Sequence, residues 1–345
     1  MPVNATAIAL ALIGVLLPGC GSTTPSAARE SEAAGPRYGL RLEGFDYPFP
    51  VRSHKIEFAG QRHAMAYMDI QPDGAPKGTV VLLHGKNFSG AYWERTARDL
   101  QTQGFRVVMP DQLGFGKSDK PLAYQYSFAG LASNTRSLLE AIGVERAIVL
   151  GHSMGGMLAT RFALMYPEVT DKLVLVNPIG LEDWAERGVP YRGLEAWYRR
   201  GLALDAEGVK RYQLESYYDG DWEPEYQRWV DMLAGLATGP GADRFAAVQA
   251  QTYDMVYSQP VVHDFPRLSV PTLLIIGQRD RTSLGKDLVS EELRDQMGRY
   301  PELGRAAARS IPGATLVEIE GVGHLPHIER YESFIAPLEA FLETR

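Results

Sequence analysis

The sequence predicts an α/β fold with a mostly parallel central sheet, helices on both faces and an inserted, mainly helical segment. Short runs that are apolar on both faces recur along the chain, as strands buried inside a parallel sheet require. Amphipathic segments separate these runs, and strands that alternate with helices indicate βαβ units and a sheet covered on both sides. The stretch 180–262 breaks this rhythm, because it holds no strand-like run but four of the five tryptophans.

The expected elements follow one another after about Tyr38. Residues His54–Phe58 and His63–Ile70, on either side of a turn at Gly60, are expected to form an antiparallel pair. The remaining strands are predicted at six apolar runs: Thr79–Leu83, Arg106–Met109, Ala147–Leu150, Lys172–Val176, Thr272–Ile276 and Thr315–Ile319. The amphipathic segments predicted as helices include Tyr92–Gln103, Phe128–Ile142 and Met154–Tyr166.

The aromatic-rich stretch 180–262 is predicted to be a helical cap, inserted into a core formed by residues 38–179 and 263–345. It is too long for an ordinary loop, and its tryptophans are Trp184, Trp197, Trp222 and Trp229. Most of its aromatic side chains are expected to build the cap's own core, and a minority to face a substrate pocket.

Residues 1–20 are predicted to be an export signal. The apolar run Ala7–Leu17 is too short to span a membrane, which takes roughly 18 residues, but it fits the apolar region of a signal peptide. The sequence Leu17-Pro-Gly-Cys20 resembles the end of a bacterial lipoprotein signal. That resemblance implies lipidation of Cys20, a flexible linker over 21–37 and a location in the bacterial cell envelope. A plain cleaved signal peptide and a misread start are the alternatives, since no Lys or Arg precedes the apolar run.

Composition and charge exclude several classes of function. The net charge of −7 argues against a nucleic-acid partner. With a single cysteine the chain can form no intramolecular disulfide. The seven histidines show no metal-ligand spacing, and no phosphate loop or dinucleotide fingerprint occurs, so neither a metal nor a cofactor is expected. The expected partner is a small-molecule substrate, and the oligomeric state stays open.

A nucleophile motif stands at Gly151-His-Ser153-Met-Gly155. The strand-like run Ala147–Leu150 precedes it and a helix-like segment follows. This context is typical of a nucleophile elbow, a tight strand-to-helix turn that exposes the serine hydroxyl. The small residues Gly151 and Gly155 are expected to allow the close packing that such a turn needs.

Five motifs together resemble those of the α/β-hydrolase superfamily, over about residues 55–342. Besides the elbow, they are His84-Gly85, the segment Asp111–Ser118, Gly277-Gln-Arg-Asp280 and Gly323-His324, each after a predicted strand and in the family's order. The resemblance to the capped esterase and aminopeptidase-like branch implies a serine hydrolase. Because a serine hydroxyl needs a base and the base needs a carboxylate, we expect Ser153 as nucleophile, His324 as base and Asp280 as the acid.

The rival candidates for these roles are weaker. His327 is expected at a surface turn or helix start, His152 to point away from the serine, and His84 to have a structural role in its loop. His54, His63 and His263 are expected to be structural, and Asp264 and Asp287 to be solvated.

The oxyanion hole is expected from two backbone amides. The amide of Met154, which follows the nucleophile, should supply one. The second should come from Lys86 or Asn87, and the sequence leaves this choice open because the loop lacks the family's glycines. The side chain of Lys86 is expected to be a solvated surface lysine, with an approach to a substrate anion as the alternative.

The leading hypothesis is hydrolysis of a carboxylic ester through an acyl-enzyme. A proline-iminopeptidase-like aminopeptidase is the alternative, together with other amide or C–C bond hydrolases. The aminopeptidase hypothesis needs acidic cap residues for the substrate amine, with candidates at Glu182, Asp183, Glu215, Asp219, Asp221 and Glu223. A non-catalytic, envelope-anchored binding protein is a second alternative, because a fold alone never establishes activity.

Overall fold

The computed structural model describes residues 35–344. The predicted signal peptide 1–20, its Cys20 and most of the predicted linker 21–37 lie outside the described residues. Within the described part, no helix is both long and apolar enough to cross a membrane.

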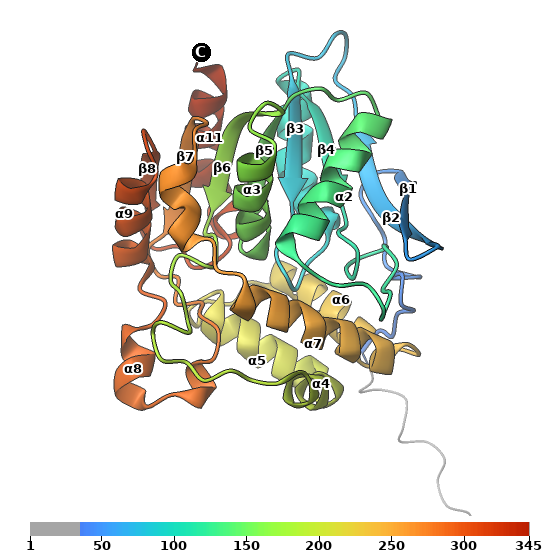
Figure 1. The fold of residues 1–345 in the computed structure, drawn as a ribbon, viewed down its shortest axis with the longest axis vertical. Helices are drawn as coiled ribbons and strands as arrows, with labels where there is room; N and C mark the ends of the chain where they lie inside the picture. The colour runs from blue at the N-terminus through green and yellow to red at the C-terminus, as the bar shows by residue number, and fades with distance from the viewer. Residues whose placement is uncertain (1–34, 345) are drawn as a thin grey trace, which may run out of the picture. The chain divides into compact units, whose positions relative to one another are not determined.

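Eight strands form one sheet in the order β1-β2-β4-β3-β5-β6-β7-β8 (Figure 1). Strand β2 runs antiparallel to both of its neighbours, and the other pairs are parallel, which confirms the predicted mostly parallel sheet. The strands are β1 Val51–Phe58, β2 Gln61–Ile70, β3 Thr79–Leu83, β4 Arg106–Pro110, β5 Ala147–His152, β6 Thr170–Val176, β7 Thr272–Gly277 and β8 Thr315–Ile319.

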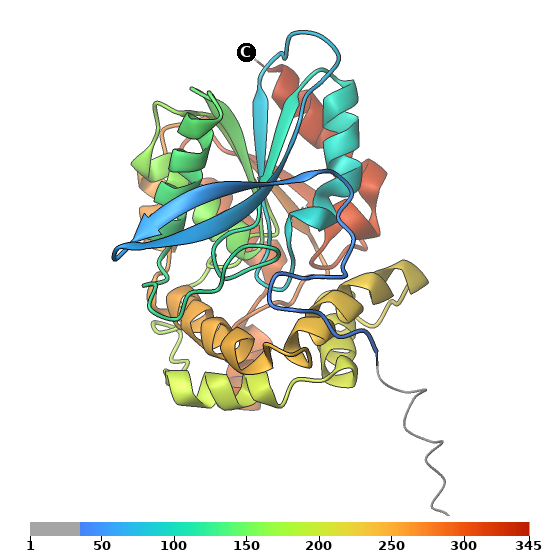
Figure 2. The ribbon, with the colours of Figure 1, turned by 90° about the vertical axis from the view of Figure 1, so that its right-hand side faces the viewer.

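Helices cover both faces of the sheet, as Figure 2 shows from the side. The helices of one face are α2 Phe128–Ala141, α3 Met154–Met165 and α9 Tyr300–Ser310; those of the other are α1 Glu94–Thr102 and α11 Tyr331–Glu343. Side chains of β3 alternate between the two faces: Val81 and Leu83 pack into one core, and Val80 and Leu82 into the other. Every residue of β3, β5 and β7 is buried, whereas the edge strand β8 exposes Thr315 and Glu318.

The predicted helix over Tyr92–Gln103 begins later than expected. A 3-10 helix, η1 Gly90–Trp93, precedes α1, and the Ser89 side chain accepts a hydrogen bond from the amide of Ala91 at its start. The other short elements are η2 Pro224–Tyr226, η3 Val262–Arg267, η4 Lys286–Leu288, α8 Glu291–Gln296 and α10 Pro326–Glu329.

Between β6 and η3 the chain forms four α-helices, which lie at one end of the sheet in both ribbon views. They are α4 Leu194–Leu202, α5 Ala206–Ser216, α6 Gln227–Ala237 and α7 Ala242–Ser258. Aromatic rings stack within this inserted segment, Trp197 on Tyr253 and Tyr218 on Tyr226. The ring of Tyr217 instead stacks on His324 of the core, at 4.8 Å between centroids. The inserted segment therefore reaches the end of the sheet where the strands finish.

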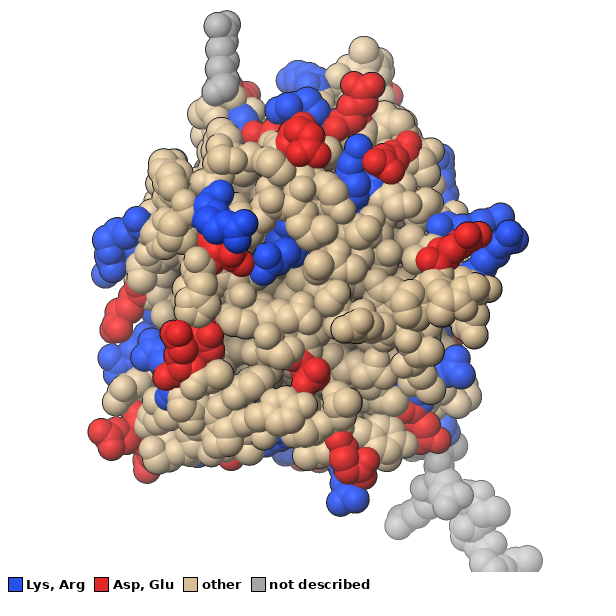
Figure 3. All heavy atoms as spheres, in the orientation of Figure 1, with Lys and Arg blue, Asp and Glu red and all other residues tan. Residues whose placement is uncertain are grey.

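The face in Figure 3 carries lysine and arginine side chains interspersed with acidic ones. Ion pairs between such side chains among the described residues include Arg161 with Asp264 and Arg192 with Asp287.

Candidate active site

Ser153 occupies the turn between β5 and α3. Its backbone has φ 57° and ψ −122°, a conformation that a residue other than glycine adopts only when its surroundings enforce it. A Cβ atom on Gly151 would lie 2.0 Å from the carbonyl oxygen of Gly155, and one on Gly155 would lie 2.3 Å from that of Leu83. Only glycine fits at either position, and this close packing holds the serine at the tip of the turn.

His324 and Asp280 form a buried hydrogen-bonded pair. Asp280 follows β7 and His324 follows β8, so parallel strands deliver both side chains to one end of the sheet. Nδ1 of His324 donates to Oδ2 of Asp280 at 2.6 Å, and neither residue is exposed to solvent. The carboxylate also accepts hydrogen bonds from the side-chain amide of Asn177 and the backbone amide of Thr282, both at 2.7 Å. These two hydrogen bonds fix the orientation of the carboxylate toward His324.

The second imidazole nitrogen of His324, Nε2, is buried and has no hydrogen-bond partner among the described residues. Because Nδ1 donates to the carboxylate, Nε2 carries the lone pair and is the atom able to take a proton. The residue beside the serine holds this histidine in place, since Nε2 of His152 donates to the backbone carbonyl of His324 at 2.7 Å.

Asn177, which sequence reasoning missed, links β6 to the acid. Its Oδ1 accepts from the amide of Gly277 at 2.9 Å, while its Nδ2 donates to Asp280. Its φ of 37° is unusual for a residue other than glycine. The available signal was its position directly after β6, at the same end of the sheet as Ser153 and Asp280.

A relay of hydrogen bonds connects the loop after β3 to His324. The amide of Gly85 donates to the hydroxyl of Tyr92 at 2.9 Å, and that hydroxyl lies 3.0 Å from Nδ1 of His152. Because the carbonyl of His324 can only accept, Nε2 of His152 carries the proton and its Nδ1 accepts from Tyr92. Burial holds the pKa of His152 well below its ordinary value, so this imidazole stays neutral.

The loop after β3 lies against the serine. A Cβ atom on Gly85 would stand 3.2 Å from that of Ser153. The amide of Phe88 closes a turn onto the carbonyl of Gly85, which leaves the amides of Lys86 and Asn87 inside the turn. In the described part of the chain neither these amides nor that of Met154 has a hydrogen-bond acceptor. All three expected donors are therefore available to an oxyanion.

The side chain of Lys86 is buried, with 8% of its surface exposed, so the expectation of a solvated surface lysine is wrong. Its Nζ donates to Oε1 of Gln249 and lies 3.5 Å from the centroid of the Tyr253 ring. Burial lowers the pKa of Lys86 well below its ordinary value. Helix α7, which the sequence did not assign to the site, supplies both contacts.

Two of the rival histidines, His327 and His84, are fixed by contacts that do not involve Asp280. His327 does stand at a helix start, but it is buried and stacked on Trp93, not at the surface. His84 lies within hydrogen-bond reach of the carbonyl of Gly85 and accepts from the amide of Gln112, in keeping with a structural role.

The other acids expected to be solvated are engaged in ion pairs. Asp264 pairs with Arg161 and Arg267, and with 19% of its side chain exposed it is less solvated than expected. Asp287, which is 46% exposed, pairs with Arg192 and Arg200.

One side-chain cluster has the composition of a metal site that sequence spacing did not suggest. Ligand atoms of Asp183, Glu186 and His263 lie within 4.8 Å of one another. Asp183 and His263 form a 2.9 Å hydrogen bond, and Glu186 and His263 are exposed. Paired, exposed side chains of this kind need no ion to be stable.

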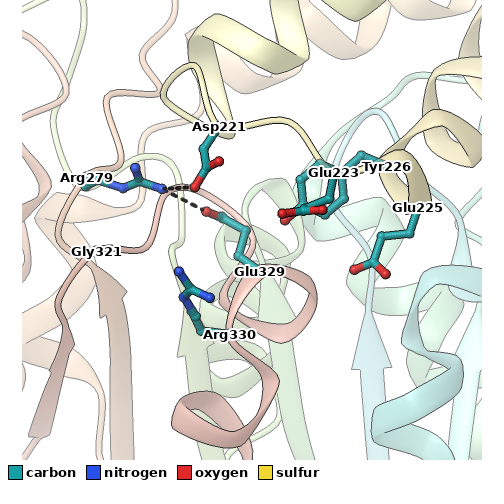
Figure 4. Close-up of a pocket in the computed structure, with 8 residues that line it drawn as sticks. All are labelled: Asp221, Glu223, Glu225, Tyr226, Arg279, Gly321, Glu329 and Arg330. Carbon is teal, nitrogen blue, oxygen red and sulfur yellow. Dashed lines mark ion pairs between the residues drawn. The ribbon is translucent and has the colours of Figure 1, made fainter.

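An acidic cleft of about 240 Å³ borders the loop that carries His324 (Figure 4). Its lining includes Glu329, Arg279 and Asp221, and the guanidinium of Arg279 lies 3.8 Å from each of the two carboxylates. Arg279 is the residue before Asp280, so this ion-pair network connects the loops of the acid and the histidine to the inserted segment.

Comparison with known proteins agrees with this geometry. Residues 78–331 match the family model described as alpha/beta hydrolase fold. The crystal structure of a probable hydrolytic enzyme from Pseudomonas aeruginosa PAO1 superposes with a TM-score of 0.88, is 52% identical, and the match covers 90% of this chain and 99% of that one.

Two sequence relatives are similar over most of the chain. An uncharacterized protein of Mycobacterium tuberculosis (strain ATCC 25618 / H37Rv) is 40% identical over 276 residues, which are 77% of this chain and 75% of that protein. The "Putative carbamate hydrolase RutD" of Pseudomonas syringae pv. syringae (strain B728a) is 30% identical over 275 residues, which are 77% of this chain and 94% of that protein. The strand order, the serine turn and these likenesses together show that the chain belongs to the α/β-hydrolase fold family.

Proposed function

We propose that the protein is a serine hydrolase that cleaves a carboxylic ester through an acyl-enzyme, with Ser153 as nucleophile, His324 as base and Asp280 as the orienting acid. The observation that carries this proposal is the buried His324–Asp280 hydrogen bond, which leaves Nε2 of His324 without a hydrogen-bond partner among the described residues, at the same end of the sheet as the turn of Ser153. Hydrogen bonds between nucleophile and base are often long in free enzymes and shorten when substrate binds.

The reaction proceeds in two steps. Oγ of Ser153 attacks the scissile carbonyl while Nε2 of His324 takes its proton, and Asp280 stabilises the imidazolium that forms. The amide of Met154 and that of Lys86 or Asn87 stabilise the oxyanion. His324 then protonates the leaving alcohol, and water, deprotonated by the same nitrogen, releases the acid.

Cleavage of a carbamate or another amide bond is the second candidate, and the relative named as a carbamate hydrolase favours it. The same side chains serve both reactions, because the tetrahedral oxyanion is common to them.

An aminopeptidase has less support, because several of the acidic residues that it needs are already engaged. Glu182 accepts hydrogen bonds from Ser283 and Gly298, and Asp183 accepts from His263. Asp219 and Asp221 lie within ion-pair distance of Arg279.

The test compares wild type with Ser153→Ala and with Ser258→Ala, which alters an exposed serine on α7. We expect wild type and Ser258→Ala to hydrolyse short p-nitrophenyl esters and to react with a fluorophosphonate probe, and Ser153→Ala to do neither. Ester hydrolysis that survives Ser153→Ala would refute the assignment. An unreactive wild type would instead support the non-catalytic binding protein. A parallel series of anilides and carbamates separates the two candidate bonds.

We also propose that the protein is exported to the bacterial cell envelope and anchored through a lipid on Cys20, a residue outside the described part. Because Cys20 is the single cysteine, labelling with radioactive palmitate of wild type but not of Cys20→Ala is the expected result. Equal labelling of both would contradict the anchor, and no labelling of either would favour a plain cleaved signal peptide.

A further inference from the structure

Lys86 joins the core to the inserted segment through its buried ammonium group. The residue lies in the loop after β3, and its Nζ contacts Gln249 and Tyr253, which are one turn apart on α7. Both partners are neutral, since one offers an amide oxygen and the other a ring face.

No carboxylate lies within ion-pair distance of the Lys86 ammonium among the described residues. An ammonium has three N–H donors. Here its partners are a single oxygen acceptor, on Gln249, and one aromatic face, that of Tyr253. A buried charge without a counter-ion is expensive to maintain. An anionic group brought by a ligand would supply the missing partner.

The position of this charge relates it to the serine. Gly85, the residue before Lys86, would place a Cβ atom 3.2 Å from that of Ser153, and the amide of Lys86 is free. The ammonium stands at the end of a four-carbon stem on the same residue. When the scissile carbonyl of a substrate lies at Ser153, the Lys86 ammonium can therefore contact a group farther along the same substrate molecule.

A cleft of about 410 Å³ adjoins the aromatic partner of this charge, with Tyr253 and Tyr212 in its wall. The ring of Tyr253 contacts the Lys86 ammonium, and the ring of Tyr212 lies 5.2 Å from that of Tyr217, which stacks on His324. The cleft therefore adjoins Lys86 through the ring of Tyr253, and His324 through the rings of Tyr212 and Tyr217.

The rim of the cleft carries more cations than anions. Its cations are Arg200, Lys286 and Arg294, and its carboxylates are Glu215 and Asp287. Asp287 is paired with Arg200, Lys286 and Arg294 donate to backbone carbonyls, and Glu215 is the remaining carboxylate of the lining, so the cations exceed the anions by one. Such a rim favours the approach of an anionic molecule.

We propose that Lys86 makes this site selective for esters that carry a carboxylate, or an equivalent anionic group, at a distance from the scissile carbonyl. The inference rests on the proposed hydrolysis at Ser153 and adds the class of substrate. The anionic group replaces Gln249 Oε1 as the partner of the ammonium, and the inserted segment supplies the walls through Tyr253.

The test uses matched pairs of substrates that differ in one terminal group. Each mono-4-nitrophenyl ester of a dicarboxylic acid, from adipate to suberate, is paired with the neutral 4-nitrophenyl alkanoate of the same chain length. The quantity measured is the ratio of kcat/KM for the charged ester to that for the neutral ester. Both substrates use the same oxyanion amides, so any damage there cancels in the ratio.

The variants are Lys86→Met, Lys86→Arg and, as control, Lys77→Met, which alters an exposed lysine. We expect Lys86→Met to lower the ratio at least tenfold at the preferred chain length. Lys86→Arg should retain most of the selectivity, and Lys77→Met should match wild type. A ratio that Lys86→Met leaves unchanged at every chain length would overturn the inference.

Failure of the inference and failure of the proposed function look different. If Ser153 reacts with a fluorophosphonate and both esters are cleaved, but the ratio does not depend on Lys86, then the inference alone fails. If neither ester is cleaved and Ser153 does not react, both fail together.

Discussion

The carboxylate of Glu329 holds the backbone on both sides of His324. Its Oε2 accepts from the amide of Gly323 and its Oε1 from that of Leu325, each at 2.8 Å. Glu329 is the last residue of α10, and its side chain is only 6% exposed. Burial raises the pKa of Glu329, against the effect of the two amides. Arg279, drawn beside it in Figure 4, connects this carboxylate to the loop of Asp280.

Glu329→Gln is expected to lower kcat roughly ten- to hundredfold with little change in KM. The substitution should shift the backbone that carries His324, and a displacement of about 1 Å at a catalytic group can reduce the rate about a hundredfold. The glutamine keeps one acceptor but turns an NH₂ group toward the other amide. We expect the free energy of unfolding to fall by about 1–3 kcal/mol.

Steady-state kinetics on a p-nitrophenyl ester and urea denaturation measure the two effects. Glu225→Gln is the matched control, because the Glu225 side chain lines the same cleft but forms no hydrogen bond with the described residues of the His324 loop. An unchanged kcat in Glu329→Gln would show that the loop does not need this support.

Asn177 is expected to position Asp280, and two substitutions separate this effect from backbone strain. Both Asn177→Ala and Asn177→Gly remove the 2.7 Å hydrogen bond to the carboxylate. Glycine accepts the φ of 37° without strain, whereas alanine does not. We expect kcat to fall about tenfold or more in both variants and stability to fall further in the alanine variant. Equal activity of Asn177→Gly and wild type would mean that His324 and Thr282 alone suffice to hold Asp280.

Tyr92→Phe is expected to loosen the loop that contributes the oxyanion amides. It removes the acceptor of the Gly85 amide and the donor to Nδ1 of His152 in one step. A buried amide left without a partner costs about 1–3 kcal/mol, so the loop should shift and kcat should fall with little effect on KM. Tyr126→Phe is the control, since it removes one tyrosine hydrogen bond, to the carbonyl of Pro121. Similar kinetics in the two variants would contradict a role for Tyr92 in the relay.

The fold could be predicted from the sequence because its signals are local. Apolar runs such as Thr79–Leu83 and Thr272–Ile276 are buried on both faces, and β7 continues only one residue further, to Gly277. The prediction missed the early start of β1 at Val51, because its first residues are exposed at the sheet edge and are not an apolar run. The 3-10 helix η1 was also missed, since its aromatic residues fit the helical pattern of the segment that follows.

The geometry around Ser153 was less accessible to sequence reasoning, because its supports come from distant parts of the chain. Asn177, Tyr92 and Glu329 each act through a pair of hydrogen bonds that no spacing rule reveals. The burial of Lys86 depends on Gln249, 163 residues away on α7. A lysine in a loop is ordinarily solvated, and only the tertiary structure shows that α7 covers this one.

The burial of Lys86 should make stability depend on pH in a defined direction. Its folded-state pKa lies well below the ordinary value, because burial disfavours the charged form. Between that lowered pKa and about 10.4, the value of a free lysine, the unfolded chain binds more protons than the folded one. The free energy of unfolding therefore rises with pH across this window. Below the lowered pKa of Lys86 the side chain is charged in both states, and the cost of burying the ammonium lowers the free energy of unfolding by its full amount.

We therefore expect wild type to gain stability relative to Lys86→Met as the pH is raised from 7 to 10, measured by urea unfolding at fixed ionic strength. The control Lys77→Met should follow wild type at every pH, since it alters an exposed ammonium. A difference between wild type and Lys86→Met that stays constant with pH would mean that the ammonium is as well compensated in the folded protein as in water. In that case Lys86 would have no need of an anionic partner, and the preference for carboxylate-bearing esters would lose its physical basis.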